Sequence, residues 1–86
     1  MKCTAFETGD GAPNDVGSDD EKYLRPKTTK DCIQSCIKEK KKDNAINGVT
    51  VKKGNDDEVK ICVCERNMAK VLRAHTDWKT CFLVPN

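Results

Sequence analysis

The chain has 86 residues, of which 36% are hydrophobic and six are cysteines, an even number. A domain of this length buries so little surface that its core alone stabilises it by only about 3–5 kcal/mol. The cysteines therefore predict a disulfide framework made in an oxidising compartment, and no apolar run approaches the ~20 residues that a transmembrane helix needs. We expect one secreted domain over residues 1–86, with its secretory signal removed and Met1 added for expression.

The net charge of +2 is unevenly distributed along the chain. Residues 1–21 contain one lysine and six acidic residues, a net charge of −5, so the remaining residues carry +7. A basic body with an acidic N-terminal stretch is consistent with an anionic partner, although charges of this kind also serve solubility alone.

The N-terminal region predicts a short strand followed by a loop. Cys3–Phe6 alternates polar and apolar residues, as a terminal strand does. Residues 8–20 are rich in Gly, Asp, Asn and Pro, which predicts a surface loop. The acidic residues of this loop lack the order of an EF-hand, so a calcium site is not expected.

A helix is predicted from Thr28 to about Asp43. Pro26 ends any earlier helix, and Thr28 with Asp31 three residues later is a capping pair. The helix carries one narrow apolar stripe, and cations crowd its last turns, where they suit the helix dipole. The stripe, predicted to be core, is Cys32, Ile33, Cys36 and Ile37, and the cations, predicted to face solvent, are Lys38, Lys40, Lys41 and Lys42.

Two strands should follow the helix and form a hairpin. Ile46–Val51 reads as a strand entered through an Asn-Gly turn, and residues 53–57 as the hairpin connection. In Val59–Cys64 the odd positions are β-branched and the even positions hold two cysteines. We expect the cysteine face to pack on the helix, and the face of Val59, Ile61 and Val63 to pack on another layer or strand.

The C-terminal region gives one ambiguous stretch and one clear strand. Residues 67–77 contain Met68, Val71 and Leu72, spaced like one or two turns of helix. Residues 79–84 form a last strand that carries Cys81 and is expected beside the first strand.

The cysteine spacing predicts a helix clamped to a strand. Side chains four apart on a helix are separated by about 6 Å, and side chains two apart on a strand by about 7 Å. Cys32 and Cys36 can therefore face Cys62 and Cys64 through two bridges. The spacing alone leaves the pairing of these four cysteines open.

Other uses of these residues fit less well. Structural zinc sites favour Cys-x-x-Cys knuckles or Cys/His mixtures, and dithiol redox centres favour Cys-x-x-Cys, which the chain lacks. The single histidine, His75, lies in a polar stretch without an evident nucleophile. We therefore expect neither an enzyme nor a cofactor nor a metal.

The basic residues are the candidate ligand-binding residues. Clustered cations bind sulfated glycans and other polyanions with release of counterions. The short connection Asn44–Ala45 leads us to expect Lys41 and Lys42 near Lys52 or Lys53. Acidic residues are interleaved and no aromatic series accompanies the cations, so nucleic acid is not expected. The candidates are Lys38, Lys41, Lys42, Lys52, Lys53 and Arg66.

Taken together, the cysteine order and three short stretches resemble the PAN/apple family of extracellular modules. The stretches are Ala45–Val51, Cys62–Glu65 and Trp78–Phe82. The resemblance implies a small disulfide-rich α+β domain, in which one helix packs across an antiparallel sheet. It also implies a nested pairing of the cysteines: Cys3 with Cys81, Cys32 with Cys64, and Cys36 with Cys62.

Family members bind proteins or carbohydrates, so the resemblance implies a secreted, non-catalytic recognition module. Its partner would be an extracellular protein or glycan. The alternative hypothesis is a small secreted effector, such as a toxin or an inhibitor of a protease or channel. In that case Arg73, or the surrounding stretch 66–77, is the best candidate for a blocking loop.

Overall fold

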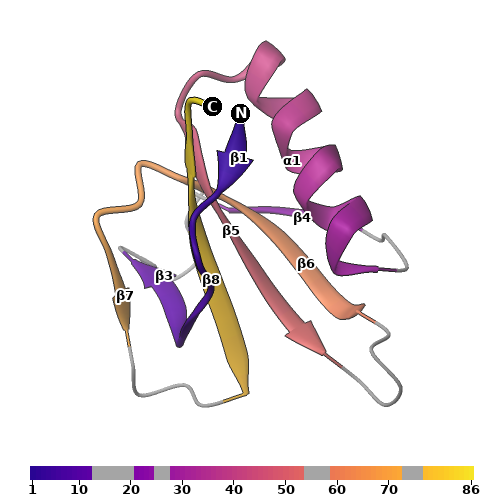
Figure 1. The fold of residues 1–86 in the computed structure, drawn as a ribbon, viewed down its shortest axis with the longest axis vertical. Coiled ribbons are helices and arrows are strands. Elements are labelled where there is room, and N and C mark those ends of the chain that lie inside the picture. Colours follow the sequence, from indigo (N-terminus) through magenta and orange to yellow (C-terminus); the bar gives the residue numbers. More distant parts are fainter. Residues whose placement is uncertain (13–20, 25–27, 54–58, 73–76) are drawn as a thin grey trace.

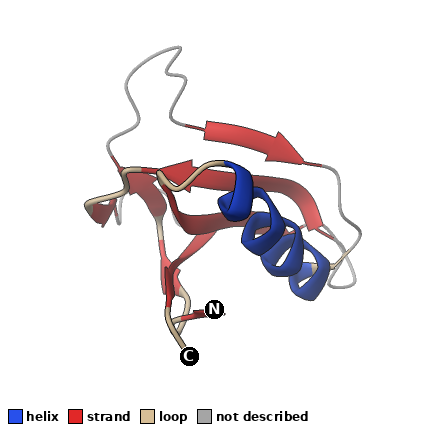
Figure 2. Cartoon of the chain, turned by 90° about the horizontal axis from the view of Figure 1, so that it is seen from above, coloured by secondary structure: helices blue, strands red, loops and turns tan. Residues whose placement is uncertain are grey.

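The computed structural model describes residues 1–12, 21–24, 28–53, 59–72 and 77–86, with the backbone alone for 21–24. One helix, α1 (Thr29–Lys42), lies across one face of an antiparallel sheet, as Figures 1 and 2 show. The chain is thus a small disulfide-rich α+β fold, as predicted.

The local sequence sets both ends of α1. The Thr28 side chain accepts a hydrogen bond from the Asp31 backbone N–H at 3.1 Å, and the Thr28 carbonyl accepts one from Cys32 at 3.0 Å. This cap satisfies N–H groups that the first helical turn leaves without partners. At the other end Asp43 is the C-cap, and its N–H bonds to the Glu39 carbonyl. The predicted helix is confirmed at both ends.

The larger sheet has six strands and is antiparallel at every described pairing. Its order along the main path is β1, β8, β5, β6 and β4, and β2 also pairs with β8. The last strand therefore lies beside the first, as predicted. The strands are β1 (Lys2–Cys3), β2 (Glu7–Thr8), β4 (Glu21–Leu24), β5 (Ile46–Lys53), β6 (Val59–Arg66) and β8 (Trp78–Val84).

The predicted Asn-Gly turn is wrong, because Asn47 and Gly48 form an irregularity inside β5. The register with β6 shifts between Ile46 and Gly48. The Asn47 side-chain amide donates to the Met68 carbonyl at 2.8 Å and accepts from the Met68 N–H at 2.7 Å. The Asn47 side chain thus forms the two hydrogen bonds with Met68 that a neighbouring strand would form. Strand β5 continues through Asn47 and Gly48.

The structure has a second sheet, of two strands. It contradicts the predictions of a loop over residues 8–20 and of helical turns in residues 67–77. β3 (Asp10–Ala12) lies within the predicted loop and pairs with β7 (Lys70–Leu72), which lies within the predicted helical turn. A Cβ at Gly11 would clash with the Met68 sulfur, so glycine allows this layer to approach the sheet closely. Residues 13–20 and 73–76 lie outside the described chain.

The two faces of the larger sheet are buried differently. The cysteines, aliphatic side chains of β5 and Leu83 form a hydrophobic core under α1. Val59 joins this core, contrary to its predicted place on the other face, because a register irregularity between Lys52 and Lys53 changes the alternation along β6. On the opposite face, toward β3, Thr50, Thr80 and Glu65 are buried.

Three disulfides join the ends of the chain and fix α1 on β6. Cys3 bonds to Cys81, as the resemblance implied, with Cα atoms 5.6 Å apart. The inner pairing that the resemblance implied is wrong. The inner bridges are Cys32–Cys62 and Cys36–Cys64, with Cα separations of 5.9 and 5.4 Å. The reason is direction, since α1 and β6 run the same way (Figure 1) and the first cysteine of each lies opposite the first of the other.

Stepwise reduction with alkylation should label Cys32 together with Cys62, and Cys36 together with Cys64. The inner bridges span 30 and 28 residues, and the chain-entropy model gives each about 4 kcal/mol of stability. Full reduction should therefore unfold the chain, as measured by circular dichroism. An intermediate with one bridge reduced, in which the two free cysteines are Cys32 and Cys64, would contradict the pairing.

Candidate functional site

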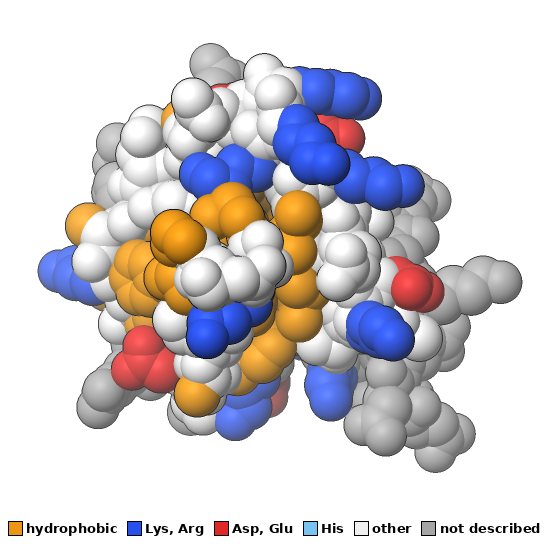
Figure 3. Space-filling view, turned by 45° about the horizontal axis from the view of Figure 1, so that its top comes forward, with side chains coloured by type: hydrophobic (Ala, Val, Ile, Leu, Met, Phe, Trp, Pro, Cys, Tyr) orange, Lys and Arg blue, Asp and Glu red, His pale blue; other side chains and the backbone are white. Residues whose placement is uncertain are grey.

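Three exposed lysines, Lys38, Lys41 and Lys42, form what we call the lysine end of α1. Lys41 and Lys42 are three and four residues after Lys38, so each is a neighbour of Lys38 on the helix surface. Figure 3 shows Lys and Arg side chains gathered over α1, at the upper right of that view. These are three of the predicted ligand residues, and the structure brings them together.

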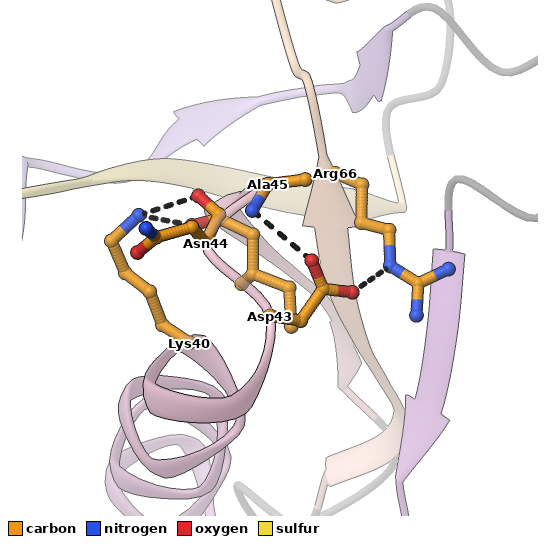
Figure 4. Close-up of polar contacts among 6 residues, drawn as sticks. Lys40, Asp43, Asn44, Ala45 and Arg66 are labelled. Carbon is orange, nitrogen blue, oxygen red and sulfur yellow. Dashed lines mark hydrogen bonds and ion pairs between the residues drawn. The ribbon is translucent and has the colours of Figure 1, made fainter.

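A set of polar contacts fixes the chain immediately after the lysine end (Figure 4). The Lys40 ammonium donates to the Asn44 carbonyl at 3.2 Å and to the Ile46 carbonyl at 2.6 Å. One Asp43 carboxylate oxygen accepts from the Ala45 N–H at 3.1 Å. Lys40 thus stabilises the connection between α1 and β5.

Arg66, a predicted ligand residue, has a structural partner instead. Its Nε lies 2.6 Å from the second carboxylate oxygen of Asp43, and the two side chains are 29% and 32% exposed. A pair this accessible to water contributes less than about 1 kcal/mol. Its main effect is geometric, because it ties the end of α1 to the end of β6.

The expectation that Lys52 and Lys53 lie near the lysine end is wrong. The short connection Asn44–Ala45 leads to the start of β5, and the strand then runs away from the helix end (Figure 1). Ile46 and Lys52 are six positions apart on an extended strand, which corresponds to roughly 20 Å. The predicted single basic patch is therefore two separate cationic regions.

The second cationic region contains an aromatic residue that the sequence interpretation did not include. Lys52 is the register partner of Trp78, and its ammonium lies 5.7 Å from the Trp78 ring centroid, within cation–π range. The next residue, Lys79, donates from its ammonium to the Thr8 hydroxyl at 2.7 Å. Only the register between β5 and β8 joins these residues, so no local sequence signal predicts the group.

Half-buried hydrophobic side chains lie at the edge of the core, and two of them share one side of α1 with Lys41. Ile33 and Ile37 of α1, with Cys3 and Phe6, pack against the edge of the core and stay partly accessible. Ile33, Ile37 and Lys41 follow at intervals of four, so they share one side of the helix. Figure 3 shows a band of hydrophobic side chains near the cations. We call these four residues the apolar band.

The cysteines are disulfide-bonded and offer no thiolate ligand. The sulfur atoms of Cys32, Cys36 and Cys62 lie within 4.8 Å of one another, but each belongs to a bridge. Within the described residues no cysteine is free. The disulfide interpretation is confirmed. His75, Arg73 and the acidic residues of 13–20 lie outside the described part of the chain.

The stretch proposed as a blocking loop is partly a strand. Residues 70–72 pair with β3 in register from Asp10 to Ala12, and Met68 is only 4% exposed. Within the described part of 66–77, Met68 and the strand 70–72 are therefore committed to packing or pairing, whereas Asn67, Ala69 and Asp77 are exposed. The inhibitor hypothesis then depends on these exposed positions and on Arg73, which lies outside the described residues.

No protein-family model, no curated protein and no solved structure matches this chain. The PAN/apple resemblance thus receives no support from these comparisons. Among the described residues, α1 is too short and too polar to cross a membrane.

Replacing Asp43 by Ala should lower the free energy of unfolding by about 1 kcal/mol, since it removes one hydrogen bond and an exposed ion pair. Urea denaturation measures the change. Asp43→Asn is the matched control, because it keeps an acceptor for the Ala45 N–H and loses only the charge. Asp43→Asn should lower the free energy of unfolding by less than Asp43→Ala does. Equal stability of both variants and the original chain would contradict a stabilising role for Asp43.

Proposed function

We propose that this protein is a secreted, non-catalytic recognition module that binds a sulfated glycan or similar extracellular polyanion through the lysine end of α1. The observation that carries the proposal is the exposure of Lys38, Lys41 and Lys42 on one fixed helix end. Ammonium groups grouped in this way bind an anionic polymer through several weak contacts and release counterions.

Rigidity supports this role. Cys32 and Cys36 are fully buried and bonded to β6, and the contacts of Lys40 and Asp43 hold the following turn. The backbone beneath the lysines is therefore ordered before any ligand arrives. Binding then loses mainly side-chain freedom, which is a smaller entropic cost than ordering a loop.

The absence of catalysis is part of the proposal. Catalytic groups must touch the substrate, and the hydroxyls of Thr50 and Thr80 and the carboxyl of Glu65 are at most 1% exposed. The six cysteines are held in disulfides. A secreted location agrees with this number of bridges in so short a chain.

Family membership remains a proposal of the same kind. An antiparallel sheet with one helix across it, and a bridge between the chain ends, agree with a PAN/apple-like module. The inner pairing Cys32–Cys62 and Cys36–Cys64 departs from what the resemblance implied. We therefore argue the function from the lysine end and not from the family.

Heparin chromatography tests the polyanion proposal. Lys41→Glu with Lys42→Glu should elute at clearly lower salt than the original protein. Lys52→Glu with Lys53→Glu is the matched control, since it makes the same change in net charge in the other cationic region, and it should shift elution less. Equal shifts would mean that only total charge matters, and elution below physiological salt, unchanged by the first pair, would overturn the proposal.

An acidic protein surface is the second candidate partner, and the apolar band favours it. Ile33 and Ile37 are partly accessible and lie on the same side of α1 as Lys41. A glycan would use the lysines alone, whereas a protein segment with both acidic and apolar side chains would use both groups. Because the band is half-buried and does not project, a partner must bring its own apolar side chains to it.

Two soluble polymers distinguish these candidates. If a protein is the partner, a copolymer of glutamate and tyrosine should bind more tightly than polyglutamate of equal charge, and Ile37→Gln should remove most of that difference. Fluorescence anisotropy measures both affinities. Equal affinities for the two polymers, with heparin binding unaffected by Ile37→Gln, would leave the glycan as the better-supported partner.

A further inference from the structure

A chain of buried oxygen atoms lies on the sheet face opposite α1. Thr50 Oγ1 lies 2.9 Å from Glu65 Oε1 and 2.8 Å from Thr80 Oγ1. Thr80 Oγ1 in turn lies 2.8 Å from the Gly9 carbonyl oxygen. Thr50 and Thr80 are fully buried, and Glu65 is 1% exposed. All three separations are hydrogen-bond distances.

Counting protons along this chain gives a definite result. A carbonyl oxygen only accepts, so the Thr80 hydroxyl proton lies toward Gly9. The contact between the threonines must then use the Thr50 proton. The remaining contact, between Thr50 and Glu65, needs a third proton, and the two hydroxyls have none left.

We propose that Glu65 is a neutral carboxylic acid in the folded protein at neutral pH and donates its proton to Thr50. The order of donation is then Glu65 to Thr50, Thr50 to Thr80, and Thr80 to the Gly9 carbonyl. Burial supports this state, because transfer from water disfavours the charged form of a carboxyl group. An ionised Glu65 would leave two oxygen atoms in contact with no proton between them.

The charged residues around Glu65 come from several elements. Glu21 of β4 is its register partner on one side, and Gly48 of β5 is the partner on the other. A Cβ at Gly11 would contact the Glu65 side chain, and the acidic residue of β3 is the preceding Asp10. The cations of β5 and β6 are Lys52, which is two positions from Thr50 and on the same face, Lys53, Lys60 and Arg66, which lies within ion-pair distance of Asp43. The neighbouring strands add Lys22, the register partner of Cys64, and Lys70, the partner of Ala12.

The Glu65 proton would make the attachment of the β3–β7 sheet depend on pH. Gly9 joins β2 to β3, and its N–H donates to the Trp78 carbonyl at 2.7 Å. The hydroxyl chain fixes the other side of the same residue through its carbonyl. Loss of the Glu65 proton removes one of the three bonds that connect β6 through β5 and β8 to this junction. The layer of β3 and β7 should then be held less firmly.

The sign of the pH dependence follows from the unfolded state. A glutamate in the unfolded chain has a pKa of about 4.3, so at neutral pH the chain takes up one proton on folding. This contribution to stability is complete below that value and falls as pH rises, until Glu65 ionises in the folded state. In that range the unfolding equilibrium constant rises about tenfold per pH unit from this group.

Carbon-13 NMR of the Glu65 side-chain carboxyl in the intact protein tests the proposal directly. The resonance should keep the chemical shift of a protonated acid from pH 5 to pH 7. A carboxylate shift throughout this range would overturn the proposal, whether or not any variant folds. This result is independent of the polyanion experiment, which concerns the other face of the sheet.

Glu65→Gln gives a second readout. The glutamine amide can donate to Thr50 as the neutral acid does, so the variant should fold and should lack the tenfold-per-unit change that Glu65 adds to the original protein. Urea denaturation at several pH values measures this difference. The same pH dependence in both proteins would contradict the assignment. Thr50→Val, which interrupts the chain, should expose the amides of β3 to faster hydrogen exchange.

Discussion

The two disulfides between α1 and β6 are the constraint on which the rest of the structure depends. One bridge would leave the helix free to pivot, whereas Cys32–Cys62 and Cys36–Cys64 together fix both its position and its direction. In so small a chain the apolar core could not do this alone. The direction of α1 then decides where its last turn lies, and hence where Lys41 and Lys42 meet solvent.

The structural features that depend on residues close together in the sequence were predicted correctly. The Thr28 cap, the length of α1 and the strands β5 and β6 follow from local patterns, and the structure confirms them. Spacing could not choose the inner pairing, because it contains no information on whether helix and strand run the same way. β3 and β7 have three residues each and are stabilised by each other, so no local pattern identifies them.

The candidate site was predictable in composition but not in arrangement. Lys38, Lys41 and Lys42 are grouped because helix periodicity groups them. Lys52 and Arg66 do not belong to this group of lysines, for different reasons. Lys52 lies at the far end of an extended strand beside Trp78, and Arg66 has Asp43 within ion-pair distance. Whether a cation is structural or available to a ligand depends on acceptors that only the tertiary fold brings near.

Lys40 and Lys41 show this division within one helical turn. They are adjacent in sequence, yet the 100° rotation per residue of an α-helix points them in different directions. Lys40 reaches the carbonyls of Asn44 and Ile46, just beyond the end of the helix. Lys41 points to the side that carries Ile37, where no such carbonyl is near enough for a hydrogen bond among the described residues. The same chemical group therefore stabilises the fold at one position and remains accessible at the next.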